Sequence, residues 1–229
     1  GRIGPAEHLD WTDLDLEKTD PDSVAAWADA TAQVLLGHGI LLNNPVAIVD
    51  YGTLFAARLF WVLTYLGATD QTVLDGGLPA WSAAGGTVES GPIMIDYGPI
   101  TADLPARNET VLAPIDAVVA AVDAATAQII DVRSSDEYAQ GHIPGAINIP
   151  YLDNSTDGIG GAYKDPAALW EMYEAAGIDL DQPIIPYCTT GVRSAVTWFV
   201  LSALGAADVR LFSGSWREWT SDPARPIQR

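Results

Sequence analysis

Apolar and polar residues alternate along the chain in blocks that predict short strands followed by helices. The first clear block is the apolar run at 46–49, which suits a buried strand. After a short loop, residues 56–66 are largely apolar, and Gly67 follows as the expected end of a helix. A second short strand is expected at 72–74, before a glycine turn and Trp81. Strand, helix and strand at this spacing predict a parallel sheet covered by helices.

This order of blocks is repeated in the second half of the chain. Residues 45–81 align with residues 183–219 without a gap at an offset of 138, so that Trp81 meets Trp219. A second match, at an offset of 140, sets the opening GRIGPA against GHIPGA at 141–146. The second copy predicts a strand at 184–187, a helix at 194–204 and a strand at 209–212. Two matches at nearly one offset indicate a tandem of two similar units.

The predicted fold class is therefore α/β, with two tandem domains that are each a small parallel sheet flanked by helices on both faces. Residues 1–98 are expected to form the first domain and residues 113–229 the second. Residues 99–112 contain prolines and suit a linker. The second unit has an earlier strand at 128–132 with no visible partner in the first unit. The N-terminal domain is thus expected to lack its first strand and helix.

Composition narrows the classes of function. The net charge of -19, with only two lysines, repels phosphate backbones and argues against nucleic-acid partners. A single cysteine excludes an internal disulfide and a cysteine-rich metal site, and the three histidines lack ligand spacing, so we expect no metal. No apolar run approaches the roughly 20 residues of a membrane helix, so no membrane partner is expected. The first residues lack the apolar core of a signal peptide, which favours a cytoplasmic location, or a periplasmic one if a signal peptide has been removed.

One loop combines the residue types that nucleophilic sulfur chemistry requires. Cys188 stands where the second-copy strand ends and a helix is about to begin, and backbone N–H groups and the dipole at a helix N-terminus stabilise a thiolate. Gly191 permits a tight turn, and Arg193 adds a permanent charge that can grip an oxyanion. Cys188 is the candidate nucleophile, with an inert buried thiol as the alternative. The candidate substrate-binding residues in and beside the loop are Thr189, Thr190, Gly191, Val192, Arg193 and Ser194.

The first unit provides an internal comparison for this loop. In the alignment Asp50 occupies the position of Cys188, and Phe55 occupies the position of Arg193. The first loop therefore has neither the nucleophile nor the cation. We expect the N-terminal domain to be catalytically inactive and to close over the active one.

Four segments resemble the rhodanese family, and together they extend over almost the whole chain. They are CTTGVR at 188–193, DVR at 131–133 with GHIPGAINIP at 141–150, VLDGGLPAW at 73–81 and SGSWREW at 213–219. The resemblance implies a sulfurtransferase whose loop cysteine takes sulfane sulfur from a small-molecule donor and passes it, as a persulfide, to cyanide or a thiol. It also implies ping-pong kinetics, no organic cofactor, and a cysteine kept only in the second of two domains.

The number of residues between the cysteine and the arginine distinguishes this chain from other enzymes that use a loop cysteine. Tyrosine phosphatases and some arsenate reductases place five residues between cysteine and arginine, which fits a phosphate-sized ion. Here only four residues separate Cys188 from Arg193. A smaller loop suits the outer sulfur of a persulfide better, so a cysteine-dependent phosphatase or arsenate reductase is the less favoured hypothesis.

The substrate is less sharply indicated than the chemistry. Many relatives that use thiosulfate carry a basic residue where this chain has Thr189, and others carry an arginine where it has Glu137. Arg133 is a candidate substrate-binding residue, with a structural salt bridge to Asp131 or Glu137 as the alternative. Thiosulfate or a protein persulfide is the favoured donor. A sulfur-relay protein with a protein sulfur acceptor and little small-molecule turnover remains an alternative.

Overall fold

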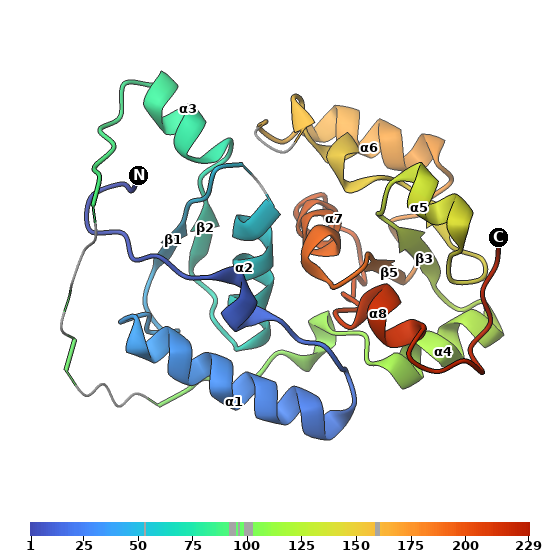
Figure 1. Cartoon of the computed structure of the whole chain (residues 1–229). Coiled ribbons are helices and arrows are strands. Elements are labelled where there is room, and N and C mark those ends of the chain that lie inside the picture. Colours follow the sequence, from blue (N-terminus) through green and yellow to red (C-terminus); the bar gives the residue numbers. More distant parts are fainter. Residues whose placement is uncertain (53, 92–94, 96, 99–102, 159–160) are drawn as a thin grey trace.

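Two small parallel sheets organise the structure, one in each half of the chain (Figure 1). The computed structural model describes residues 1–52, 54–91, 95, 97–98, 103–158 and 161–229. The first sheet pairs β1 (Val46–Ile48) with β2 (Gln71–Val73), and the second has the strand order β4-β3-β5. The strands of the second sheet are β3 (Gln128–Asp131), β4 (Ile147–Asn148) and β5 (Ile184–Tyr187). The predicted α/β class, with small parallel sheets flanked by helices, is confirmed.

The helices surround these sheets and fill the connections between strands. The α-helices are α1 (Pro21–Gly37), α2 (Leu54–Tyr65), α3 (Gly77–Ala83), α4 (Ile115–Ala124), α5 (Ser135–Gln140), α6 (Pro166–Ala175), α7 (Val192–Ala203) and α8 (Ser215–Trp219). The described residues also form the short 3-10 helices η1 (Trp11–Leu14), η2 (Glu109–Val111) and η3 (Tyr151–Asn154). The predicted helices 56–66 and 194–204 are α2 and α7, and each begins two residues earlier than predicted.

The helix α1 is an element that the repeat did not indicate. Its start is set locally, because the Asp20 side chain accepts a hydrogen bond from the Ser23 N–H at 3.0 Å and Pro21 occupies the first turn. One face of α1 is buried, with Ala28 and Leu35 fully inaccessible to solvent. Before β1 the described residues form η1 and α1, with no strand beyond an isolated bridge. At the offset of 138, α1 lies opposite α6 and not opposite α5, the helix that follows β3, so the expectation that the first unit lacks its opening strand and helix stays a prediction.

The predicted strand at 209–212 is wrong as a regular strand. The structure gives only two isolated parallel bridges in this segment, Ile184 with Val209 and Leu112 with Leu211. The segment runs beside β5, since the Arg210 N–H donates to the Ile184 carbonyl at 3.0 Å and the Phe212 N–H donates to the Pro186 carbonyl at 3.2 Å. Pro186 has no N–H to donate in return, so the ladder with β5 is incomplete and a regular strand does not extend here. The predicted strand at 128–132 is confirmed as β3.

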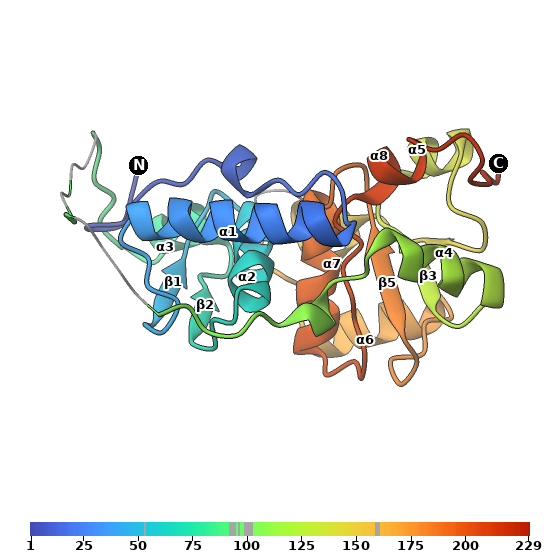
Figure 2. The same ribbon diagram turned by 90° about the horizontal axis from the view of Figure 1, so that it is seen from below.

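The two halves meet along α2 and α7, which pack against each other (Figure 2). Phe60 of α2 lies against the rings of Trp198 and Phe199 of α7, with centroids 6.4 and 5.0 Å apart. One cluster of buried apolar side chains includes Trp61 from the first half and Leu201 from the second. The apolar core is therefore continuous between the halves, and α2 of the first half packs against α7 of the second.

The linker predicted at 99–112 can be described only in part. Residues 99–102 lie outside the described residues. The remainder contains η2, and the Asn108 N–H donates to the Tyr65 carbonyl at 2.8 Å. Within the described parts of the chain, no helix has the length and apolarity needed to cross a membrane.

Candidate active site

Cys188 follows β5 directly and begins the loop that leads into α7. We call residues 188–193 the cysteine loop. The Cys188 side chain is fully buried, and Gly191 stands before the first residue of α7 in a left-handed conformation with φ of 87°. A Cβ atom on Gly191 would lie 2.4 Å from the Ser213 carbonyl oxygen. Glycine is required here both for its backbone angle and for this close approach.

Two donors point at the sulfur atom. The Gly191 N–H donates to Cys188 Sγ at 3.1 Å, and the Ser194 hydroxyl lies 3.7 Å from the same atom. Both groups belong to the N-terminal end of α7, where the helix dipole adds partial positive charge. Both contacts come from hydrogen-bond donors, and the thiolate that the sequence leads us to expect at this position stays a prediction.

A second segment holds the loop from the other side. We call residues 212–218 the cover segment. The Cys188 N–H donates to Ser215 Oγ at 3.1 Å, while the Trp216 N–H donates to the Cys188 carbonyl at 3.0 Å. The Arg217 N–H donates to the Thr189 carbonyl at 3.0 Å. Sequence reasoning noted the SGSWREW motif here but missed that two of its serines lie against the loop.

Arg193 is already paired with an acid. Its two terminal nitrogens donate to the Glu137 carboxylate at 2.8 Å each, and one of them also donates to Thr189 Oγ1 at 2.5 Å. The Arg193 hydrogen bond is the main reason that the pKa of Glu137 falls from 4.5 to about 2. The same bond is the largest cause of the raised pKa of Arg193. The charge of a Cys188 thiolate is a smaller cause in the same direction. The guanidinium fork therefore faces Glu137 of α5 in this structure.

Arg133 lies in a buried ion pair next to the second sheet. Its guanidinium donates to the Asp131 carboxylate, with the shortest contact at 2.5 Å, and to the Gly141 carbonyl at 2.7 Å. The ring of Trp216 lies 4.5 Å from its guanidinium carbon. Asp131 also accepts the Arg133 backbone N–H at 3.0 Å. The salt bridge that the sequence raised as an alternative for Arg133 is thus formed, and its partner is Asp131.

The remaining candidates occupy the rim and the floor of the loop. Thr189, Thr190 and Arg193 are partly exposed, whereas Val192 and Ser194 are buried in the first turn of α7. The Thr189 hydroxyl contacts both Arg193 and Glu137, so it belongs to the ion pair at the rim. The structure therefore brings all the predicted loop residues together, with Arg133 next to the cover segment.

In the matching loop of the first half, the backbone N–H groups donate to a carboxylate of the same loop. The Asp50 carboxylate accepts N–H groups from Gly52, Phe55 and Ala56, each at 2.9 Å. These donors belong to the loop and the first turn of α2, the positions that correspond to the cysteine loop and α7. Both loops therefore direct N–H groups at the same place, and the first fills that place with its own carboxylate.

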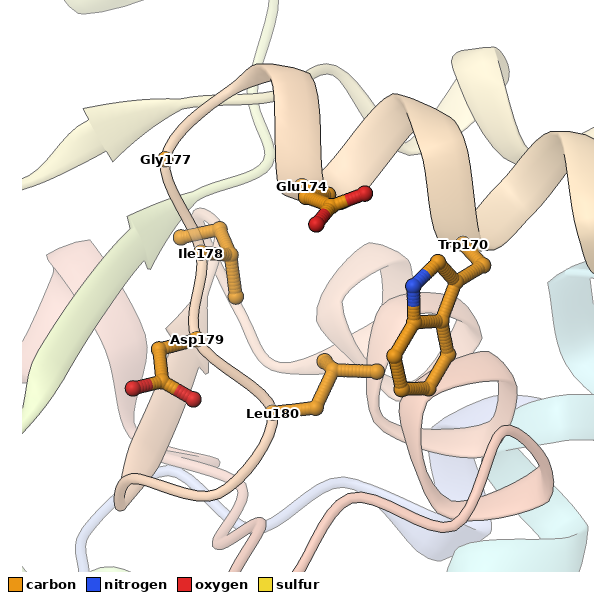
Figure 3. Close-up of a pocket in the computed structure, with 6 residues that line it drawn as sticks. All are labelled: Trp170, Glu174, Gly177, Ile178, Asp179 and Leu180. Atoms are coloured by element: carbon orange, nitrogen blue, oxygen red, sulfur yellow. The ribbon is translucent and has the colours of Figure 1, made fainter.

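A surface hollow elsewhere in the second half does not involve these residues (Figure 3). It measures about 300 Å³ and lies at the end of α6, lined by Trp170, Glu174, Gly177, Ile178, Asp179 and Leu180. Figure 3 shows the Trp170 ring beside Leu180. Among the described residues, no His, Cys, Asp and Glu side chains gather as three or more potential metal ligands.

A buried cysteine that follows a parallel strand and begins a loop at a helix N-terminus defines a class of α/β proteins with cysteine-based sites. The profile of the rhodanese-like domain matches residues 115–222. A Mycobacterium tuberculosis protein named "Putative thiosulfate sulfurtransferase SseB" is 38% identical over 200 residues, which are 83% of this chain and 69% of that protein. The 3-mercaptopyruvate sulfurtransferase of Escherichia coli K12 is 30% identical over 83% of this chain and 70% of its own length. The chain belongs to the rhodanese family and is a sulfurtransferase.

Solved structures agree with this assignment. The crystal structure of SseA from Escherichia coli, a 3-mercaptopyruvate sulfotransferase, superposes with a TM-score of 0.69 at 30% identity and covers 79% of this chain and 70% of SseA. A complex of EanB with ergothioneine gives a TM-score of 0.86 at 23% identity and covers the whole of this chain. This chain spans 60% of the EanB chain, and the likeness to EanB concerns the fold alone.

Proposed function

We propose that Cys188 is the nucleophile and carries sulfur as a persulfide. The observation that supports this most directly is the 3.1 Å hydrogen bond from the Gly191 N–H to Cys188 Sγ at the start of α7. A thiolate is the reactive form of cysteine, and a helix N-terminus stabilises it without a separate general base. The chain has no second cysteine, so no internal thiol can resolve the persulfide.

The proposed reaction has two displacement steps. The Cys188 thiolate attacks the outer sulfur of thiosulfate, so that a new S–S bond forms while the S–S bond of the donor breaks and sulfite leaves with the electron pair. Cyanide or a thiolate then attacks the outer sulfur of the persulfide, and Cys188 leaves as a thiolate. No net oxidation state changes outside the transferred sulfur and its partners, so neither step requires an external oxidant. The Gly191 N–H and the Ser194 hydroxyl would hold the persulfide.

Thiosulfate and 3-mercaptopyruvate are the donors suggested by the names of the relatives. Both are anions, and an anion that approaches the cysteine loop meets the closed Arg193–Glu137 pair. Arg193 can hold the donor only if it turns from Glu137 or shares its fork with the donor. We therefore favour thiosulfate as a substrate used with modest efficiency, or a persulfide donor that does not need the arginine.

The N-terminal half, residues 1–98, is proposed to be a second rhodanese-like unit without a nucleophile, and residues 113–229 the catalytic unit. Three lines support this assignment. The two sequences repeat at nearly one offset, each half has a strand that leads through a loop into a helix (β1 to α2 and β5 to α7), and Asp50 accepts N–H groups at the place of Cys188. Residues 99–112 are then the linker.

Intact-protein mass spectrometry tests the nucleophile directly. After incubation with thiosulfate or 3-mercaptopyruvate, the wild-type protein should gain the mass of one sulfur atom, and Cys188→Ser should gain none. Thiocyanate formation from thiosulfate and cyanide should be lost in the same variant. Ser202→Ala, at the far end of α7, is the matched control and should behave as wild type. Thiocyanate production by Cys188→Ser at the wild-type rate would exclude the proposed role of Cys188.

A sulfur-relay role is the second candidate, and the Arg193–Glu137 pair favours it because it reduces attraction for small anions. A relay protein would gain sulfur on Cys188 from a protein persulfide but produce little thiocyanate from thiosulfate. Hydrolysis of a nitrophenyl phosphate that depends on Cys188 would instead indicate the phosphatase alternative.

A further inference from the structure

Arg58 is a buried cation in the half of the chain that has no cysteine. It lies on α2, and its side chain is completely inaccessible to solvent. One terminal nitrogen donates to Ser213 Oγ at 3.1 Å, and the other donates to the Leu14 carbonyl at 2.8 Å. The guanidinium carbon lies 4.7 Å from the centre of the Trp61 ring, and the Nε atom has no hydrogen-bond partner among the described residues. No carboxylate accepts a hydrogen bond from Arg58 within that part of the chain.

Burying a guanidinium without a hydrogen-bonded carboxylate costs free energy of folding. The charges around Arg58 therefore indicate what stabilises its charged form. Burial lowers the pKa of Arg58 to about 10, while the charges of Asp15 and then of a Cys188 thiolate act in the opposite direction and Arg217 adds to the lowering. Asp15 is already held by Arg217 through two hydrogen bonds of 2.9 and 3.1 Å. Asp15 is therefore shared with Arg217, and a Cys188 thiolate is the second anion that favours the charged form of Arg58.

Ser213 of the cover segment lies between Arg58 and the residues that contact the Cys188 sulfur. Ser213 accepts the Arg58 hydrogen bond, and the backbone of Ser213 lies directly against Gly191, where even an added Cβ would not fit. Gly191 in turn donates its N–H to Cys188 Sγ. Arg58 thus stands behind the cysteine loop, on the side formed by the N-terminal half.

The other charged and titratable groups near the sulfur lie on different elements. Arg193 lies at the exposed rim and is paired with Glu137. Burial is the largest cause of the raised pKa of Tyr151 in η3, and the charge of a Cys188 thiolate also raises this pKa. Arg58 is the cation of this group that has no carboxylate hydrogen-bonded to it in the described structure.

We propose that Arg58 is a positioning residue through which the N-terminal half supplies fixed positive charge behind the cysteine loop and favours the thiolate and persulfide forms of Cys188. This inference rests on the proposed role of Cys188 as the sulfur carrier. It also assigns a task to the half that lacks a nucleophile. In a low-dielectric interior a cation has a substantial effect on a nearby anion, because little water screens the pair.

The test measures ionisation of Cys188 without any sulfur donor. The chain has one cysteine, so the rate of alkylation by iodoacetamide as a function of pH reports Cys188 alone. In Arg58→Met the pH midpoint of alkylation should rise by about one unit, which slows alkylation roughly tenfold at pH values below the midpoint. In Arg58→Lys, which keeps the charge, the midpoint should stay within about 0.3 units of wild type. Equal midpoints in folded Arg58→Met and wild type would overturn the proposal, as would equal shifts in the Met and Lys variants.

Ser213→Ala provides a second test of the proposal if Arg58→Met does not fold. Loss of the Ser213 hydroxyl removes the link between Arg58 and the cover segment, and we expect the midpoint to rise by about half a unit. An unchanged midpoint in Ser213→Ala would then overturn the proposal. Failure of the proposed function is seen separately, because it appears as the absence of a one-sulfur mass gain on wild-type Cys188.

Discussion

Glu137 and Arg193 face each other across the cysteine loop, joined by two hydrogen bonds of 2.8 Å. Under the proposed function, we expect this pair to control how the loop receives an anionic donor. Arg193 keeps its full charge, yet its fork is occupied by a residue of α5 rather than open to solvent. We therefore expect access for an anionic donor to depend on Glu137, the partner of Arg193, as much as on Arg193 itself.

Glu137→Gln should increase the use of thiosulfate. Removal of the carboxylate frees the guanidinium to bind the donor, and we expect kcat/KM for thiosulfate to rise by about tenfold, the effect of about 1.4 kcal/mol. The measurement is thiocyanate formation at several thiosulfate concentrations. Glu171→Gln, an exposed site on α6, is the control and should leave the kinetics unchanged. A decrease in Glu137→Gln would show instead that Glu137 positions Arg193 for the reaction.

The same pair should contribute to stability in a defined pH range. The pKa of Glu137 is lowered in the folded protein from 4.5 to about 2, so its contribution is present above about pH 5 and is lost as the pH falls towards 2. Because 36% of the Glu137 side chain is exposed, water screens the pair and the contribution is below about 1 kcal/mol. Urea unfolding at pH 7 should therefore show wild type slightly more stable than Glu137→Gln, with the difference shrinking towards pH 2. A difference that grows in acid would contradict this assignment.

Gly191→Ala should destroy the geometry of the cysteine loop. A Cβ atom would lie 2.4 Å from the Ser213 carbonyl oxygen, and φ is 87°. We expect sulfur transfer to fall at least about a hundredfold and the free energy of unfolding to fall by about 2 kcal/mol or more. Gly205→Ala is the matched control, because Gly205 has φ of 86° but no neighbour within 4 Å of an added Cβ. The control should lose only about 1 kcal/mol of stability and retain activity.

Arg133→Lys separates a structural role from substrate binding. A lysine cannot reproduce the forked contact with Asp131 in this buried place, so we expect the free energy of unfolding to fall by about 2–4 kcal/mol. The KM for thiosulfate should change by less than about twofold in the folded protein. Chemical unfolding and steady-state kinetics on one preparation provide both values. A large rise in KM with unchanged stability would place Arg133 in the substrate site.

Asp50→Ala tests the anion site of the first loop. The change leaves three N–H groups without their acceptor, and we expect a loss of about 1–3 kcal/mol in the free energy of unfolding. Asp50→Asn keeps one acceptor oxygen and should lose less. Thiocyanate formation should remain within about twofold of wild type in both variants if the first half lacks catalytic residues.

The sequence by itself determined the local elements of this protein. The apolar run at 184–187, Cys188 after it and Gly191 before the helix predict a strand, a loop and a helix N-terminus, because strand and helix starts depend on neighbouring residues. The fixed offset between the halves similarly predicted two related α/β units and the replacement of Cys188 by Asp50. The segment 209–212 shows the limit of this reasoning, since whether an apolar run becomes a strand depends on a partner that local sequence does not specify.

The tertiary structure decided which charges surround the sulfur. Arg193 and Glu137 are 56 residues apart, and Arg58 and Ser213 are 155 apart, so neither contact has a local signal. The sequence predicts that Arg193 can grip an oxyanion, and only the tertiary structure shows that Arg193 is hydrogen-bonded to Glu137 of α5. The sequence gives no signal for a role of Arg58, because a single arginine in an apolar helix can be interpreted only when its buried neighbours are known. Packing of α2 against α7 places that arginine behind the loop, where burial removes the water that would otherwise screen its charge.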